Sequence, residues 1–132
     1  MGNYVPVGGK LEPFETPDEA AKRETFEEIG VKVDNFKLRW IMTETSPVKC
    51  NFINYIYVAE VDYFVPNECN EGILERIEES KLKTIPTPQT DLLIYEYLSK
   101  NTFFVFDALY DEEVTLLSLI EKITGKILYE KK

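Results

Sequence analysis

Residues 9–31 constrain the fold and the chemistry of this 132-residue chain more than any other segment. Thr16 is followed by Pro17, at the first position of a helix, and by Glu19 three residues on, which together form a capping box. Good helix formers follow, and a glycine stands just after Ile29, where a left-handed residue would end the helix. The sequence therefore predicts a helix from Pro17 to Ile29.

Three carboxylates of this helix share one face. At about 100° per residue, Glu24, Glu27 and Glu28 fall within an arc of about 100°. Glu28 lies close to the direction of Ala21, so its carboxylate is predicted to be partly buried. Like charges at this spacing destabilise a helix, and more so when buried. The arrangement predicts a bound cation, whereas a solvated acidic helix face is the alternative interpretation.

The residue types indicate a hard divalent cation. The chain has no histidine, and Cys50 and Cys69 stand far apart, so the available ligands are carboxylate and carbonyl oxygens. This set favours Mg²⁺, with Mn²⁺ as the alternative, over Zn²⁺. Gly8 and Gly9 let the main chain come near an ion or a phosphate, so that a carbonyl could complete the coordination. Lys10 could meet a phosphate as a point charge.

The spacing of these residues resembles the signature of the Nudix hydrolases, G-x5-E-x7-R-E-U-x-E-E-x-G-U, in which U is a bulky apolar residue. The chain departs from it only at Thr25 and matches it at Gly9, Glu15, Arg23, Glu24, Glu27, Glu28, Gly30 and Val31. The resemblance implies a single α/β domain over residues 1–132, a Nudix-type α/β/α sandwich with a mixed sheet. In such a fold the loop–helix–loop segment binds Mg²⁺ and a diphosphate.

The resemblance also implies roles for individual residues. Gly9 would give a carbonyl to the metal, and Glu27 and Glu28 would be the principal ligands. Glu24 would be a ligand or the general base. Gly8 and Lys10, which precede the helix, are expected from their own chemistry rather than from the resemblance to contact the phosphates of the substrate.

The same resemblance implies supporting roles for four further residues. Arg23 would orient the neighbouring glutamate, and Glu15 would lie behind the metal ligands. Glu71, on an acidic loop, would join the metal site or act as the general base; a surface turn is an equally weighted alternative. Asp91 would read the edge of a nucleobase, although a helix cap formed by Asp91 or the preceding threonine is favoured.

Hydrophobic patterns predict the remaining elements. Residues 36–43 alternate as a half-buried strand, and residues 51–63 carry apolar side chains on both faces, which predicts a central strand covered on both sides. Residues 90–99 read as a helix and residues 103–109 as another strand. The tail, residues 114–128, is ambiguous between strand and helix.

Composition limits the classes of partner. With 44% hydrophobic residues and no apolar run near 18 residues, the chain is expected to be one soluble domain that does not cross a membrane. A net charge of −9 argues against binding a nucleic-acid polymer, but not against a single nucleotide held through metal. Two cysteines without a close partner and no secretory signal favour the cytoplasm; a disulfide is the less favoured alternative.

The front of the chain departs from the resemblance. Nudix domains usually place a strand of the mixed sheet and a hairpin before the motif, whereas here the motif begins at residue 9. We therefore expect the N-terminal strand to be missing and a strand edge beside Tyr55 to be unpaired. Such an edge favours a homodimer or a strand-swapped assembly.

Together these features predict a Mg²⁺-dependent pyrophosphohydrolase of nucleoside diphosphates linked to another group. The small single-domain layout resembles MutT-type enzymes. This favours nucleoside triphosphates, 8-oxo-dGTP among them, which would give a monophosphate and pyrophosphate. ADP-ribose and dinucleotide polyphosphates stay open as substrates. The alternative from another class is a non-catalytic nucleotide-binding or regulatory Nudix module, or an inactive fragment.

Overall fold

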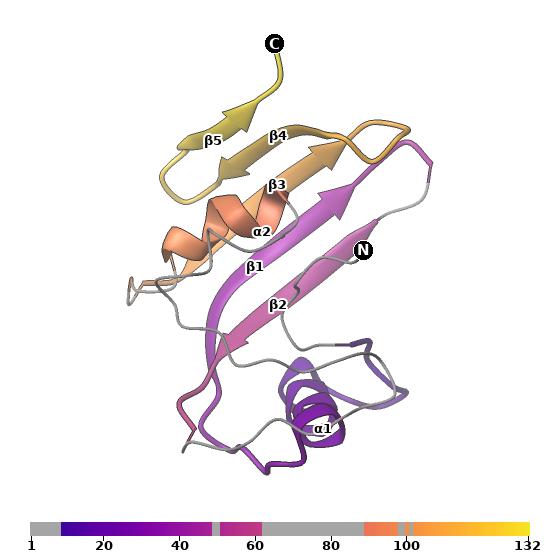
Figure 1. Cartoon of the computed structure of the whole chain (residues 1–132), viewed down its shortest axis with the longest axis vertical. Helices are drawn as coiled ribbons and strands as arrows, with labels where there is room; N and C mark the ends of the chain where they lie inside the picture. The colour runs from indigo at the N-terminus through magenta and orange to yellow at the C-terminus, as the bar shows by residue number, and fades with distance from the viewer. Residues whose placement is uncertain (1–8, 49–50, 62–88, 98–99, 101) are drawn as a thin grey trace. The chain divides into compact units, whose positions relative to one another are not determined.

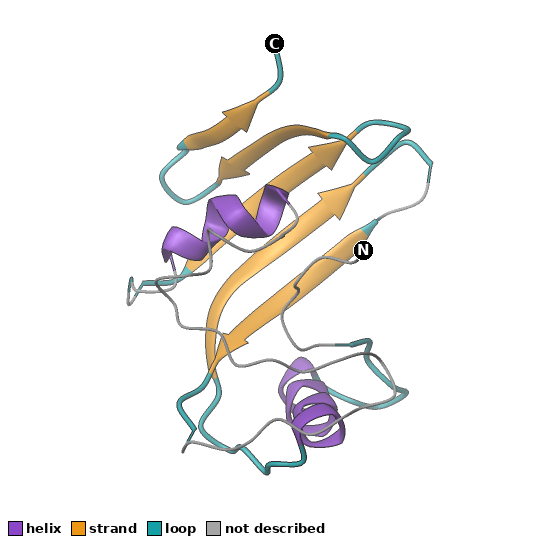
Figure 2. Cartoon of the chain, viewed as in Figure 1, coloured by secondary structure: helices purple, strands orange, loops and turns teal. Residues whose placement is uncertain are grey.

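The computed structural model describes most of the chain and divides it into two compact units. We call them the helical unit, within residues 1–37 and 57–86, and the sheet unit, residues 38–56 and 87–132. The described residues are 9–48, 51–61, 89–97, 100 and 102–132. In chain order the elements are α1 (Pro17–Ile29), β1 (Lys37–Thr45), β2 (Phe52–Val58), α2 (Gln89–Ile94), the 3₁₀ helix η2 (Tyr95–Tyr97), β3 (Phe104–Tyr110), β4 (Leu116–Glu121) and β5 (Ile127–Glu130) (Figures 1 and 2).

Helix α1 has the predicted bounds because both of its ends are capped locally. The backbone N–H of Glu19 donates to Thr16 Oγ1 (3.3 Å), and the N–H of Thr16 donates to Glu19 Oε1 (3.1 Å). Gly30, at φ 74°, ends the helix and donates its N–H to the carbonyl of Phe26 (2.9 Å). Glycine adopts this left-handed conformation without the steric cost of a Cβ atom.

The strands form a mixed sheet in the order β2-β1-β3-β4-β5. Strands β1 and β3 are parallel and pair from Trp40 opposite Phe104 to Thr45 opposite Leu109. The pairs β3/β4 and β4/β5 are antiparallel. The predicted α/β class with a mixed sheet is confirmed, and its parallel pair joins segments that are far apart in the sequence.

The hydrophobic core of the sheet unit lies between its strands and the helical turns α2 and η2. Trp40, Phe106 and Leu119 are fully buried there. The ring of Tyr97 meets the ring of Phe104 edge-on, with centroids 4.6 Å apart, and Ile94 of α2 is buried in the same cluster. Burying side chains of this size stabilises the fold by about 1.5–3 kcal/mol each.

The predicted environment of β2 is wrong among the described residues. The strand stands first in the sheet order, and Phe52, Ile53 and Tyr55 are exposed. Apolar residues on both faces of a strand are compatible with a central, doubly covered position, but the pattern does not determine where in the sheet the strand lies.

The C-terminal tail, whose sequence is ambiguous between strand and helix, forms the strands β4 and β5. A buried glutamate closes the turn between them: Glu121 accepts hydrogen bonds from the backbone N–H groups of Val105 (3.1 Å), Ile123 (2.8 Å) and Thr124 (2.8 Å) and from the Thr124 hydroxyl (2.7 Å). Burial raises the pKa of Glu121, but these hydrogen bonds outweigh it and lower the pKa to about 2. The buried charge of Glu121 is thus hydrogen-bonded by the turn after β4 and by Val105 of β3.

Within the described part of the chain, no helix combines the length and the apolar character that crossing a membrane requires.

Candidate active site

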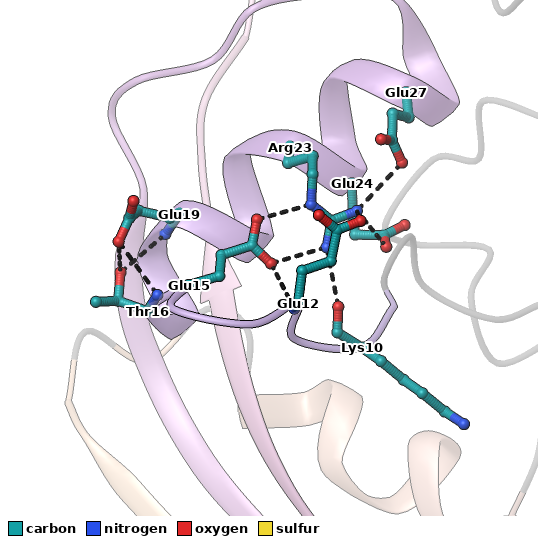
Figure 3. A network of polar contacts seen from close by, with 8 residues as sticks. All are labelled: Lys10, Glu12, Glu15, Thr16, Glu19, Arg23, Glu24 and Glu27. Carbon is teal, nitrogen blue, oxygen red and sulfur yellow. Dashed lines mark hydrogen bonds and ion pairs between the residues drawn. The ribbon is translucent and has the colours of Figure 1, made fainter.

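Arg23 of α1 is the centre of a polar network in the helical unit (Figure 3). Its Nε and Nη2 donate to the two carboxylate oxygens of Glu15, at 2.7 and 2.9 Å. Its Nη1 donates to Glu24 Oε1 (2.8 Å) and to Glu27 Oε2 (3.3 Å). Nη2 also donates to the carbonyl of Lys10 (2.9 Å), which ties the loop before the helix to the helix itself.

The two-pronged contact between Arg23 and Glu15 dominates the electrostatics of this network. The Arg23 guanidinium, helped by the backbone N–H of Glu12, lowers the pKa of Glu15 to about 2. Hydrogen bonds to Glu15 and Glu24 in turn raise the pKa of Arg23. Arg23 therefore stays charged and holds two helix carboxylates in place, a geometry that the planar fork of arginine allows and lysine does not.

Gly9 lies directly against the carboxyl group of Glu24. A Cβ atom at residue 9 would stand 2.3 Å from Cδ and from Oε1 of Glu24. Only a glycine leaves room for the carboxylate at this point, so the loop backbone and the helix side chain approach each other here.

The donor set around Gly9 and α1 fits Mg²⁺ in its chemistry. All of the groups are oxygens: the carboxylates of Glu24, Glu27 and Glu28 and the main chain at Gly9, where a carbonyl can approach. The Glu27 side chain is exposed, whereas Oε2 of Glu28 is buried, as the helix pattern predicts. Among the described residues, however, no group of three acidic, histidine or cysteine side chains is arranged to hold an ion together.

The sheet unit contains a separate cavity of about 420 Å³. It is lined by residues from β1, β2, α2 and the β3–β4 hairpin, namely Glu44, Phe52, Gln89, Thr90, Tyr110, Val114, Thr115 and Leu116. Val114, in the hairpin turn, has a φ of 63°, which a β-branched residue rarely adopts. The turn is fixed by Asp111, whose Oδ1 accepts from the N–H groups of Glu113 and Thr115, both at 2.9 Å.

A chain of hydrogen bonds runs along the polar side of this cavity. The Tyr110 hydroxyl donates to Glu44 Oε2 (2.7 Å), and Asn54 Nδ2 donates to Glu44 Oε1 (2.8 Å). Because Tyr110 has one proton to give, the Thr90 hydroxyl, 2.5 Å away, is the donor in their contact. Burial raises the pKa of the Tyr110 hydroxyl, which therefore remains a donor at neutral pH.

Asp91 lies in the first turn of α2, beside this chain of hydrogen bonds. Burial, with the nearby charge of Glu44, raises the pKa of Asp91 to about 6. The Asp91 carboxyl group therefore changes from its neutral to its charged form as the pH rises through about 6.

Comparison with known proteins decides the family. The chain matches the NUDIX domain over residues 2–97, about three quarters of its length. The chain belongs to the Nudix family. The chain therefore contains a Nudix hydrolase domain.

A solved structure and a curated relative support this assignment. The crystal structure of a mutator MutT protein from Bacillus halodurans is 25% identical and superposes with a TM-score of 0.83, covering 92% of this chain and 84% of that one. The NAD-capped RNA hydrolase NudC of Chromobacterium violaceum is 39% identical over 61 residues, 46% of this chain. The matched segment spans 22% of the length of that relative. The Nudix fold is thus shared along nearly the whole chain.

The structure brings together part of the Nudix motif. Arg23 donates hydrogen bonds to Glu15, Glu24 and Glu27, and Gly9 lies against the carboxyl group of Glu24. The carbonyl of Lys10 also accepts from Arg23, whereas the Lys10 side chain is exposed. Gly8 and Glu71 lie outside the described residues. Their assigned contacts with phosphate and metal stay predictions, as do the metal-binding roles of Gly9, Glu24, Glu27 and Glu28.

The sequence patterns predict none of the residues that line the cavity. They do single out Asp91, which follows the lining residue Thr90 in α2. Asp91 itself is not among the lining residues, whereas Gln89 and Thr90 are. Glu44 carries a weak signal, as the single acidic residue of a strand that otherwise holds two basic residues, four apolar residues and two threonines. The sequence around Tyr110 indicates only the start of a turn.

Proposed function

We propose that this Nudix domain is a Mg²⁺-dependent pyrophosphohydrolase that cleaves nucleoside triphosphates to the monophosphate and pyrophosphate. The observation that carries the proposal is the intact polar network of the motif. Arg23 holds Glu15, Glu24 and Glu27, and Glu24 lies against Gly9. A domain without catalysis has no need to keep several carboxylates crowded around one helix face.

Each residue of the network has a distinct proposed task. The carboxylates of Glu24, Glu27 and Glu28 and the carbonyl of Gly9 would hold the metal ion. When bound, the ion neutralises the charge of the polyphosphate and lowers the pKa of the attacking water. Arg23 keeps Glu24 oriented toward the loop, and Glu15 keeps Arg23 oriented in turn. Glu24 and Glu71 remain the two candidates for the general base.

The likeness to a MutT protein supports purine nucleoside triphosphates, 8-oxo-dGTP among them, as the substrates. Within the sheet unit, Asp91 and Gln89 at the start of α2 are candidates to contact the edge of a nucleobase. The name of the NudC relative, an NAD-capped RNA hydrolase, favours a second substrate class, NAD-capped RNA.

An assay over a panel of nucleotides tests the proposal. The panel contains dGTP, 8-oxo-dGTP, ADP-ribose, NADH and NAD-capped RNA, each with Mg²⁺, with Mn²⁺ and with EDTA. We expect release of pyrophosphate and a nucleoside monophosphate from a triphosphate, dependent on the added metal. A chain that binds nucleotides but cleaves no member of the panel would support the regulatory alternative.

Two variants separate chemistry from folding. Glu27→Gln preserves the shape of an exposed side chain but removes a charged ligand, so the rate should fall at least about 100-fold with an unchanged unfolding temperature. Glu113→Gln makes the same chemical change in the β3–β4 turn of the sheet unit and should leave the rate unchanged. Equal rates in the Glu27→Gln variant and the wild type would remove Glu27 from the metal site.

A further inference from the structure

The cavity of the sheet unit combines an acceptor-rich side with apolar walls. Glu44, Thr90 and Tyr110 supply the polar side, and Phe52 and Leu116 supply apolar surface. Small-molecule sites are typically apolar pockets of about 300–1,000 Å³ in which a few polar groups fix the orientation of the ligand. At about 420 Å³ the cavity is of the right size for a planar heterocycle, and the half-exposed ring of Phe52 offers a face for stacking.

The Glu44 carboxylate is held in one orientation. Asn54 donates to one oxygen and Tyr110 to the other, at 2.8 and 2.7 Å. A carboxylate has about four acceptor sites, so two remain open after these bonds. The salt bridges formed among the described residues do not include Glu44. Toward the described residues, the Glu44 carboxylate therefore keeps acceptor capacity to spare at the cavity that it lines.

The neighbouring hydroxyl protons are already engaged. Tyr110 gives its proton to Glu44, and Thr90 gives its proton to Tyr110. Neither hydroxyl can donate to a ligand unless an existing bond breaks. This side of the cavity can accept hydrogen bonds but has few to give.

We propose that Glu44 is a specificity-determining residue of this domain. Its carboxylate accepts hydrogen bonds from a base that presents adjacent N–H and amino donors, as the guanine-type edge does, and it disfavours adenine. The inference rests on the proposed function for the class of ligand, a purine nucleotide, and concerns the sheet unit alone. An adenine ring would place the lone pair of N1 opposite the carboxylate, so that only its 6-amino group could donate to Glu44, which a partly buried site penalises.

Binding of nucleoside monophosphates tests the inference independently of catalysis, since they contain no anhydride to cleave. Calorimetric titration of the full chain with GMP, IMP and AMP should show GMP binding at least about tenfold more tightly than AMP. IMP, which lacks the 2-amino group, should lie between them. Equal affinities for the three ligands, or no measurable GMP binding, would overturn the proposal.

The Glu44→Gln variant identifies the residue responsible. Its amide can donate to N1 of adenine, so the ratio of GMP to AMP affinity should fall at least about tenfold. A merely structural role would weaken all three ligands alike and leave this ratio unchanged, which would refute the assignment. Glu130→Gln, at the exposed end of β5, is the matched control and should bind as the wild type does.

Tyr110→Phe provides a second variant if Glu44→Gln does not fold. It removes one donor from Glu44 and frees the Thr90 hydroxyl to donate to a ligand, so the ratio of GMP to AMP affinity should fall at least about threefold. An unchanged ratio in a folded Tyr110→Phe variant would contradict the inference. If the chain hydrolyses nothing but prefers GMP through Glu44, this inference is supported and the proposed hydrolysis is refuted. If the chain hydrolyses nucleotides with a base preference that does not depend on Glu44, the proposed hydrolysis is supported and this inference is refuted.

Discussion

The carboxyl group of Glu24 occupies the space that a side chain at Gly9 would need, with Cδ of Glu24 2.3 Å from the position of a Cβ atom there. The contact joins the loop before α1 to the helix. Because the blocking atoms belong to the far end of a flexible side chain, this glycine constrains where the carboxylate lies more than it constrains the backbone.

Gly9→Ala should therefore lower activity with little effect on stability. The new methyl group pushes the Glu24 carboxylate out of its position, while the flexible side chain relieves the clash at small cost. We expect kcat to fall at least about tenfold, because displacement of a catalytic group by about 1 Å is costly to the rate. The measurement is steady-state hydrolysis across a Mg²⁺ series, together with the unfolding temperature.

Gly125→Ala is the matched control for that substitution. Gly125 has a φ of 79°, and no atom lies within 4 Å of the position that a methyl group would take, so alanine meets no neighbour but adopts a strained backbone. The variant should lose about 1 kcal/mol of unfolding free energy and keep its full activity. The opposite pattern in the two variants, with Gly125→Ala inactive and Gly9→Ala active, would contradict the role given to the Glu24 contact.

Arg23→Lys should weaken both activity and stability at neutral pH. Lysine keeps the charge but cannot contact Glu15 with two parallel donors and reach Glu24 at the same time. The pKa of Glu15 is lowered to about 2 from 4.5, so the stabilisation from this pair is present above pH 4.5 and is lost as the pH falls toward 2. Thermal unfolding between pH 2 and 7 should show the two proteins converging at low pH. A constant difference across this range would mean that the pair does not stabilise the fold.

Asp91→Asn should stabilise the protein at alkaline pH. The pKa of Asp91 is raised to about 6 from 3.8, so its contribution to stability is fully present below pH 3.8 and is lost as the pH rises through 6. Asparagine avoids the cost of the buried charge, and we expect a gain of about 1–2 kcal/mol at pH 8 that disappears below pH 4. Urea unfolding at these two pH values measures it. A variant less stable than the wild type at pH 8 would show that the ionised carboxylate is favourably bound.

Glu121→Gln should destabilise the sheet unit. An amide group turns a donor toward at least one of the four groups that now donate to the carboxylate, which costs about 1–3 kcal/mol. The pKa of Glu121 is about 2, below its ordinary 4.5, so the wild-type advantage should vanish as the pH falls from 4.5 toward 2. The exposed Glu130→Gln serves as the control in urea unfolding. If both variants unfold at the same urea concentration as the wild type, the buried carboxylate is not a stabilising element.

Local signals predict the helical unit well. The bounds of α1 follow from the capping box at Thr16 and from Gly30, both of which act within one turn of the helix. The resemblance to the Nudix motif likewise implies that Arg23 orients Glu24, and the structure places the two side chains in a hydrogen bond.

The sheet unit is less predictable because its contacts join distant segments. Glu44 and Tyr110 are 66 residues apart, and no local sequence pattern predicts the hydrogen bond between them. The exposure of Phe52 and Tyr55 depends on the place of β2 in the sheet order, which alternation along one strand does not encode. Glu121 looks like an ordinary surface glutamate in the sequence, although the turn that follows it supplies its partners.

The parallel pairing of β1 with β3 has a consequence for synthesis on the ribosome. Strand β1 is made early, but the neighbour that completes one of its edges, residues 104–110, emerges only after about sixty more residues have been translated. Until then the growing polypeptide exposes an open strand rich in large apolar groups. Molecular chaperones that shield nascent chains should therefore engage this protein throughout the interval.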